Sequence, residues 1–251
     1  MKALVIAERA TAARELAAGA RTMADEVVLV SFGEVPEGVA DRIAHISIPS
    51  GSVVDDGADT VVFVFDTEQP SVVLVEPTRH MKTIAGKVAA RAGTSVITDV
   101  ISFESGVKSL YFGGVAERVQ KAAGDVAVYT VAAGAFEGVE ASGANVVEDI
   151  AWVVPANPVK LISSKPIEKS GVDLTKADIV VAAGRGFAEK EDLEMAEVLC
   201  DKLGAGLGCS RPLTEGVDWL PTEIYLGVSG LMLSPKVYIG VGISGQMQHM
   251  V

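Results

Sequence analysis

The stretch ADIVVAAGRG, residues 177–186, decides the fold class of this chain. Its unbroken apolar run from Ile179 to Ala183 is typical of a parallel strand that is buried on both faces. The glycines that follow predict a tight turn, and residues 189–204 then carry apolar positions at helical spacing with a stop at Gly204. The stripe expected to be buried consists of Leu193, Ala196, Val198, Leu199 and Leu203. A strand, a glycine turn and a helix in this order predict an open parallel α/β sheet.

Apolar runs of the same kind alternate with helix-like segments through the first half of the chain. The runs are residues 2–8, 26–33, 45–49, 59–66 and 71–77. We interpret them as strands, and they predict a doubly wound N-terminal α/β domain.

Residues 78–93 predict a helix, because Ile84, Val88 and Ala92 have helical spacing. Thr78 is placed to cap its start and Gly93 to end it. The shorter apolar runs between residues 95 and 131, with glycine turns among them, predict a small β extension of the same domain.

A domain boundary is expected within or just after residues 154–174, where prolines, lysines and serines separate two apolar patterns. We therefore expect one domain over residues 1–165 and a second over residues 171–251, beginning near Gly171.

Composition excludes several classes of function. The chain has 251 residues, a formal net charge of −12 and no basic block, which argues against a nucleic-acid partner. No apolar stretch reaches the roughly 20 residues that span a bilayer, and the start lacks a signal peptide, so the expected location is the cytoplasm. Cys200 and Cys209 form no metal or redox motif and are expected to be two buried thiols.

Four glycine-containing turns of the second domain could line one crevice, because turns at the carboxyl ends of parallel strands share an edge. They are residues 184–186, 208–212, 226–230 and 242–249. Gly240, Gly242 and Gly245 also satisfy G-x-G-x-x-G, but no acidic residue follows at the distance that a Rossmann site requires. Backbone donors at the start of a helix still favour an anion there. For any single turn, the alternative is that glycine serves only the tight bend.

These motifs resemble those of one known family. The segments 177–186, 203–212 and 238–249 are similar to the FAD-binding domain of the electron transfer flavoprotein α subunit, whose runs include a GRG turn, G-A-S-R and G-I-S-G-A-I-Q-H. Residues 78–100 and 159–181 also resemble that family. The resemblance implies a C-terminal FAD-binding domain of the deoxyhypusine-synthase-like NAD/FAD-binding type.

The resemblance also implies roles for individual residues. Arg185 would lie beside the phosphate or adenosine part of FAD, and Arg211 over the flavin ring, where a permanent cation favours an added electron. Ser229 would meet the ring, and His249 would donate a hydrogen bond to its pyrimidine carbonyl. Ser244 and the backbone around Gly245 would bind the pyrophosphate. The full expected set is Arg185, Gly186, Ser210, Arg211, Pro212, Gly227, Val228, Ser229, Gly230, Gly242, Ile243, Ser244, Gly245, Gln248 and His249.

The implied function is that of an electron carrier. It would pair with an electron transfer flavoprotein β subunit and take electrons from acyl-CoA-type or other flavin dehydrogenases, without being a stand-alone enzyme. Tyr225 and Val228 stand where the family has glutamine, and the family's later adenosine-binding segments do not occur in these 251 residues. Two alternatives stay open: a flavin-free nucleotide-binding homologue with a structural or regulatory role, and an NAD-dependent enzyme of the related fold.

Overall fold

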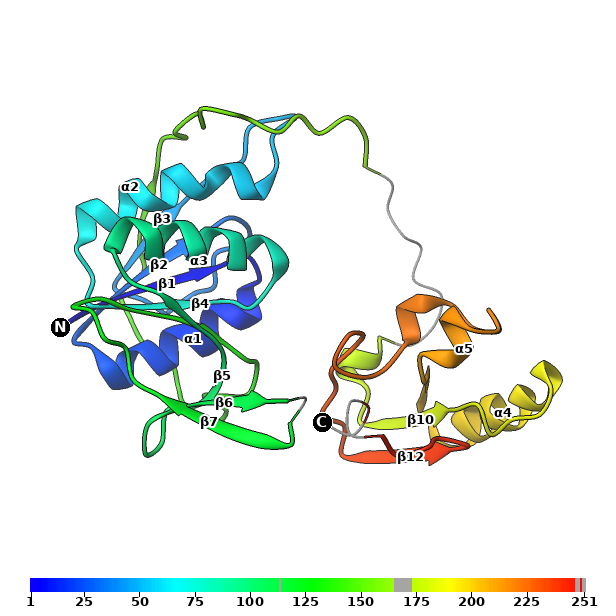
Figure 1. The fold of residues 1–251 in the computed structure, drawn as a ribbon. Helices are drawn as coiled ribbons and strands as arrows, with labels where there is room; N and C mark the ends of the chain where they lie inside the picture. Colours follow the sequence, from blue (N-terminus) through cyan, green and yellow to red (C-terminus); the bar gives the residue numbers. More distant parts are fainter. Residues whose placement is uncertain (113, 165–172, 247–248, 250–251) are drawn as a thin grey trace. The chain divides into compact units, whose positions relative to one another are not determined.

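The computed structural model describes residues 1–112, 114–164, 173–246 and 249, and these divide into two units (Figure 1). The first comprises Met1–Leu110 and Glu117–Ser164, and the second contains the remaining described residues. Each unit has its own sheet and its own hydrophobic core. The expected class, a two-domain α/β protein, is therefore confirmed. The boundaries at 165 and 171 stay predictions, because residues 165–172 lie outside the described part.

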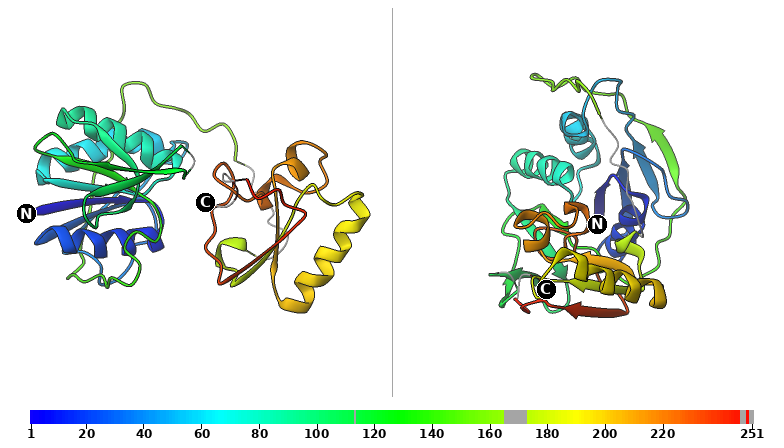
Figure 2. Two further views of the ribbon diagram at one scale, coloured as in Figure 1. Left: turned by 60° about the horizontal axis from the view of Figure 1, so that its bottom comes forward. Right: turned by 90° about the vertical axis from the view of Figure 1, so that its right-hand side faces the viewer.

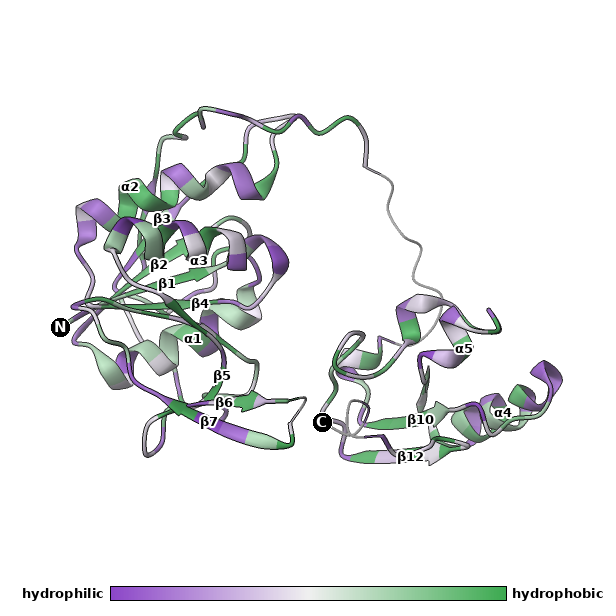
Figure 3. Ribbon diagram, viewed as in Figure 1, coloured by the Kyte–Doolittle hydropathy of each residue, from purple (hydrophilic) through white to green (hydrophobic). Residues whose placement is uncertain are grey.

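A mixed sheet forms the centre of the first unit. Its strands are β1 (Lys2–Ala7), β2 (Glu26–Ser31), β3 (Arg42–His45), β4 (Val72–Val75), β5 (Val96–Ser102), β6 (Val107–Tyr111), β7 (Ala116–Gln120), β8 (Ala127–Val131) and β9 (Val146–Asp149). They lie in the order β7-β6-β5-β8-β4-β1-β2-β3-β9. From β5 to β9 neighbouring strands run parallel, whereas β6 is antiparallel to β5. In Figure 3 the central strands β1 and β4 are drawn mainly in the hydrophobic colour, as expected for strands buried on both faces.

Helices cover both faces of this sheet, which makes the unit doubly wound (Figure 2). Helix α1 (Ala10–Met23) packs on one face through Ala13, Leu16 and Ala17. The short 3-10 helix η1 (Val54–Gly57), helix α2 (Ala58–Glu68) and helix α3 (Arg79–Ala92) lie on the other face. The caps expected for α3 are confirmed: the Thr78 hydroxyl accepts a hydrogen bond from the Met81 N–H at 3.2 Å, and Gly93 is left-handed with φ 65°.

Three expectations for this unit were wrong. Residues 45–49 are not a strand, since β3 ends at His45 and the chain leaves the sheet there. Residues 59–66 form most of helix α2 and not a strand, because the parallel connection from β3 to β4 needs a crossover and Val61, Val64 and Phe65 supply a helical buried face. The runs 95–100 and 126–131 are not a separate extension, since β5 and β8 belong to the main parallel sheet. Strands β6 and β7 alone extend it.

The second unit has a parallel sheet of β10 (Ile179–Ala183), β11 (Gly206–Cys209) and β12 (Val237–Val241), with β10 in the middle. Its helical segments are η2 (Leu174–Lys176), η3 (Lys190–Asp192), α4 (Leu193–Leu203), α5 (Pro212–Glu215) and η4 (Thr222–Ile224). Gly204 ends α4 with φ 61°, as expected.

The buried stripe of α4 is narrower than expected. Leu193, Ala196 and Cys200 are buried, and Leu199 is half-buried. Val198 and Leu203 are 44% and 40% exposed, because only one face of the helix meets the small sheet.

Candidate functional site

The carboxyl ends of the three parallel strands of the second unit meet at one edge. Ala183 at the end of β10 pairs with Cys209 of β11 on one side and Val241 of β12 on the other. The turns that begin at Gly184, Ser210 and Gly242 therefore start at the same edge, as expected from the sequence. This is the edge at which open α/β sheets bind their ligands.

Two of these turns touch through their backbones. The Gly184 N–H donates to the Val241 carbonyl at 2.8 Å, and the Gly186 N–H donates to the Gly242 carbonyl at 2.9 Å. A Cβ on Gly184 would lie 2.2 Å from the Gly242 carbonyl oxygen, and one on Gly186 would lie 2.6 Å from the Gly242 Cα. Gly242 itself has φ +68°. Glycine is required here by close backbone approach, so the purely local explanation of a tight bend is incomplete.

The fourth turn, residues 226–230, lies beside the end of β11. The Leu226 N–H donates to the Cys209 carbonyl at 2.8 Å, and the Gly227 N–H donates to the Leu231 carbonyl at 3.0 Å. The Tyr225 hydroxyl lies 2.7 Å from the hydroxyl of Ser229, while the neighbouring Val228 is 46% exposed. All four predicted turns are thus brought to one region of the second unit.

Arg211 lies in the turn after β11, at the start of α5. Its side chain is exposed, and its Nε donates to Glu215 Oε2 at 2.5 Å. The hydrogen bond and charge of Glu215 raise the pKa of the Arg211 guanidinium. The turn is anchored to β10 and to the core of the second unit. The Ser210 N–H donates to the Ala183 carbonyl at 2.9 Å, and Leu213 is fully buried. Glu215 was not predicted as a partner of Arg211, although its i,i+4 spacing on a short helix is a recognisable signal.

Most of the other predicted site residues are exposed at these turns: Arg185, Gly186, Pro212, Gly230, Ser244 and Gly245. Ile243 is half-buried against the core. Residues 243–246 are not helical, and His249, the next described residue, is helical. Gln248 lies outside the described residues.

His249 is held by two other parts of the unit. Its Nδ1 lies 3.2 Å from the Leu226 carbonyl oxygen, which can only accept, so Nδ1 carries the proton. Its Nε2 is hydrogen-bonded to the hydroxyl of Tyr238 in β12, and burial raises the pKa of Tyr238 to about 12. Both ring nitrogens have protein partners, so the expected donation to a flavin carbonyl would require one partner to be exchanged.

A pocket of about 290 Å³ adjoins His249 and the fourth turn. It is mostly apolar and is lined by Leu226, Gly227, Leu231, Met232, Leu233, Ser234, Pro235, Tyr238 and His249. Leu231, Met232, Leu233 and Tyr238 were not predicted to line a pocket. Nothing in the sequence distinguishes an apolar residue that lines a pocket from one that belongs to the core.

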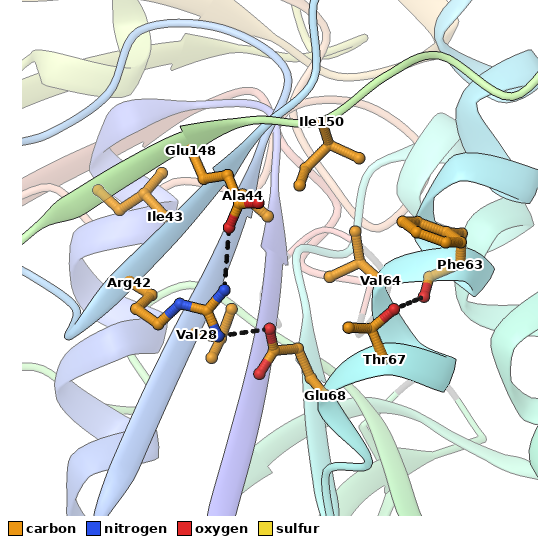
Figure 4. Close-up of a pocket in the computed structure, with 10 residues that line it drawn as sticks. All are labelled: Val28, Arg42, Ile43, Ala44, Phe63, Val64, Thr67, Glu68, Glu148 and Ile150. Carbon is orange, nitrogen blue, oxygen red and sulfur yellow. Dashed lines mark hydrogen bonds and ion pairs between the residues drawn. The ribbon is translucent and has the colours of Figure 1, made fainter.

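The first unit has a smaller pocket of about 120 Å³, between α2 and strands β2, β3 and β9 (Figure 4). Arg42 crosses it and donates to Glu68 at 2.7 Å and to Glu148 at 3.0 Å. Glu68 also pairs with Lys2 at 2.8 Å. The charged side chains that line this pocket therefore pair with one another. Their ion pairs link β3 to α2 and to β9 at the edge of the sheet.

Comparison with known proteins identifies the family. Residues 4–156 match the profile described as "Electron transfer flavoprotein domain", and residues 173–251 match "Electron transfer flavoprotein FAD-binding domain". The chain belongs to the electron transfer flavoprotein family. Its FAD-binding domain is of the α-subunit type and contains the four turns described above.

Individual relatives of this electron transfer flavoprotein chain are similar over most of its length. It is 34% identical to "Protein FixB" of Salmonella typhimurium strain LT2, with 94% of the chain and 80% of the relative covered. It is 33% identical to "Protein FixB" of Escherichia coli O127:H6 with the same coverage. For "Protein FixB" of Escherichia coli O7:K1 the identity is 39% over 71% of the chain and 59% of the relative.

The residues of the second unit fit FAD as the bound group. The contact of Gly184 and Gly186 with Gly242 brings the turns after β10 and β12 together at the strand ends, where open α/β sheets bind their ligands. Arg185, Arg211 and Ser244 are exposed at the turns that begin at this edge. Within the described residues, no cluster of His, Cys, Asp and Glu could hold a metal ion. Among the helices that the structure describes, none is both long enough and apolar enough to cross a membrane.

Proposed function

We propose that this chain is the FAD-carrying α subunit of an electron transfer flavoprotein. It takes electrons from flavin dehydrogenases, of the acyl-CoA type or another, and passes them to an acceptor as a heterodimer with a β subunit. The observation that carries the proposal is the meeting of four glycine turns at one sheet edge, within a domain that matches the family's FAD-binding profile. The cytoplasm stays the predicted location.

Bound FAD would supply reversible electron uptake, and the chain's own groups would hold and tune it. The turns at residues 184–186 and 242–245 would bind the pyrophosphate, with the Arg185 guanidinium, the Ser244 hydroxyl and the backbone N–H groups around Gly245 as donors. Arg211 would place a permanent positive charge near the ring and favour the reduced state. Ser229 and His249 would supply polar contacts to FAD after giving up their hydrogen bonds to Tyr225 and Tyr238, respectively. A carrier needs positioning and charge, without a general base or a nucleophile.

Flavin absorbance of the purified full chain tests the proposal. We expect a yellow protein that loses flavin in Arg211→Ala, with affinity for added FAD weakened on the order of tenfold. Arg79→Ala is the matched control, since Arg79 is also exposed but lies in the first unit. Co-expression with a family β subunit should give a complex on size exclusion.

A colourless chain that binds AMP but no FAD would instead indicate the flavin-free homologue. That alternative draws support from the pairing of Arg211 with Glu215 and of His249 with Tyr238, which occupies two groups expected to face the flavin. An FAD-dependent gain in stability of the wild-type chain would argue against it.

A further inference from the structure

The sheet of the first unit has a switch point between β1 and β4. From β1 the chain winds outward to β2 and β3 on one side, and it then returns to β4 on the other side of β1. Loops that leave two such strands diverge at their carboxyl ends and open a crevice, where open α/β sheets bind ligands. The loop after β1 begins at Glu8, and the loop after β4 begins at Glu76.

Helix α1 starts just after the loop that follows β1. Helix α1 begins at Ala10, the preceding Arg9 is extended, and no side chain of its own caps the helix. The first turn also contains no acidic residue. Uncapped N–H groups together with the helix dipole favour an anion at this position, which is how many such crevices hold a phosphate.

The carboxylate of Glu76 lies directly before the start of this helix. Its side chain is 0% exposed, and its Oε2 accepts the N–H of Glu8 at 2.8 Å and the N–H of Arg9 at 3.1 Å. Its Oε1 is paired with the guanidinium Nε of Arg9. A buried carboxylate is tolerated only when several charged or aligned donors compensate its lost hydration, and three donors do so here.

A second layer of charge lies outside Glu76. His80, in the first turn of α3, places Nδ1 3.1 Å from Glu8 Oε2 and Nε2 3.8 Å from Asp55 Oδ2 in η1. The charged side chains named here, from the loops after β1 and β4 and from α3 and η1, therefore bind one another.

We propose that Glu76 is a built-in anion that takes the place of a phosphate in the first domain. The domain has the topology of a nucleotide-binding domain, but its own side chain closes the crevice. The chain would then bind a nucleotide only in its second domain, and removal of the Glu76 carboxylate would uncover an anion site at Glu8 and Arg9. This inference does not depend on the proposed electron-carrier function.

Titration of the full chain with inorganic phosphate tests the proposal, with the amide signals of Glu8 and Arg9 followed by NMR. In the wild type we expect neither signal to move with phosphate or AMP beyond a chloride control of equal ionic strength. In Glu76→Ser we expect both signals to move and saturate with phosphate. We also expect a lowered melting temperature that phosphate partly restores. Glu148→Gln is the matched control, since it removes an exposed carboxylate paired with Arg42 and should respond like the wild type.

Two results would overturn the proposal: saturable movement of the Glu8 and Arg9 signals in the wild type, or a folded Glu76→Ser chain whose two signals ignore phosphate. If Glu76→Ser does not fold, the wild-type titration decides alone. Because only signals from the first unit are read, phosphate bound at the glycine turns of the second unit does not affect the outcome.

Discussion

The guanidinium of Arg211 shares its turn with the carboxylate of Glu215, which lies one helical turn further along α5. Both side chains are exposed, so water screens the pair and either partner can be exchanged for a ligand. The charge that Arg211 offers to a bound flavin is therefore partly cancelled by its own neighbour.

Substitution Glu215→Gln should raise the reduction potential of bound FAD. It removes a negative charge beside the proposed ring site and leaves the positive charge of Arg211 uncompensated, which favours the reduced flavin. Equilibrium titration against a redox dye measures the potential. Glu223→Gln, an exposed substitution in η4, should leave it unchanged. An unchanged potential in Glu215→Gln would place Arg211 and Glu215 away from the flavin.

The buried thiol of Cys209 makes the free energy of unfolding depend on pH in the alkaline range. Burial raises the pKa of its thiol from 9.0 to about 12, so the unfolded state releases its proton first as pH rises. The contribution of Cys209 is therefore fully present below pH 9.0 and is lost toward pH 12, at up to about 1.4 kcal/mol per pH unit.

Urea unfolding at pH 8.5 and 10.5 checks this, since the loss of stability between the two should shrink in Cys209→Ala. Cys200→Ala is the comparison, because burial also raises the pKa of that thiol, though less. Equal losses in wild type and Cys209→Ala would show that Cys209 does not titrate in this way.

At the scale of elements, the close contact between the turns after β10 and β12 depends on Gly242. Gly242 and Gly245 both have left-handed φ, +68° and +69°, but a Cβ would clash only at Gly242, where it would lie 2.9 Å from the Gly186 Cα. Gly245→Ala should cost about 1 kcal/mol for backbone strain alone. Gly242→Ala should cost roughly 2–3 kcal/mol more, because backbone atoms must move apart. Chemical denaturation of the two variants measures the difference, and equal costs would mean that the turns do not touch.

The helices and strands that could be predicted from the sequence are those marked by nearby residues. Thr78, Gly93 and Gly204 mark helix ends through their own backbone or side-chain chemistry, and the continuous apolar runs mark buried strands. Residues 59–66 were misread because a run of Val and Phe has strong β preference, while the crossover between β3 and β4 imposes a helix. The insertion of β8 between β4 and β5 has no local signal, since strand order depends on contacts between distant residues.

The same distinction applies to the candidate site. The four turns were predicted to share an edge because the carboxyl ends of parallel strands always do. The pairing of His249 with Tyr238 and Leu226 was not predicted, because it joins three segments that are separated in sequence.

At the scale of the whole molecule, two separate cores predict separate responses to FAD. Val5, Leu29 and Leu74 belong to the core of the first unit, whereas Val180 and Leu226 belong to that of the second. FAD at about 100 times its dissociation constant should stabilise the second unit by about 2.7 kcal/mol. Hydrogen exchange with mass spectrometry should show slowed exchange in β10, β11 and β12 and unchanged exchange in β1, β2 and β4. Equal protection of both units would contradict this prediction.

Strand β9 also has a consequence for the order in which the first domain can be completed during synthesis. It pairs with β3 at the edge of the sheet, although about a hundred residues separate the two strands. The chain then continues along the same side, where the N–H of Val153 donates to Thr60 and that of Val159 to Asp56. A nascent chain of 131 residues already contains helices α1 to α3 but leaves the β3 edge unpaired. A ribosome must therefore release residues well beyond 150 before this edge is sealed, and until then it is open to pairing with another chain.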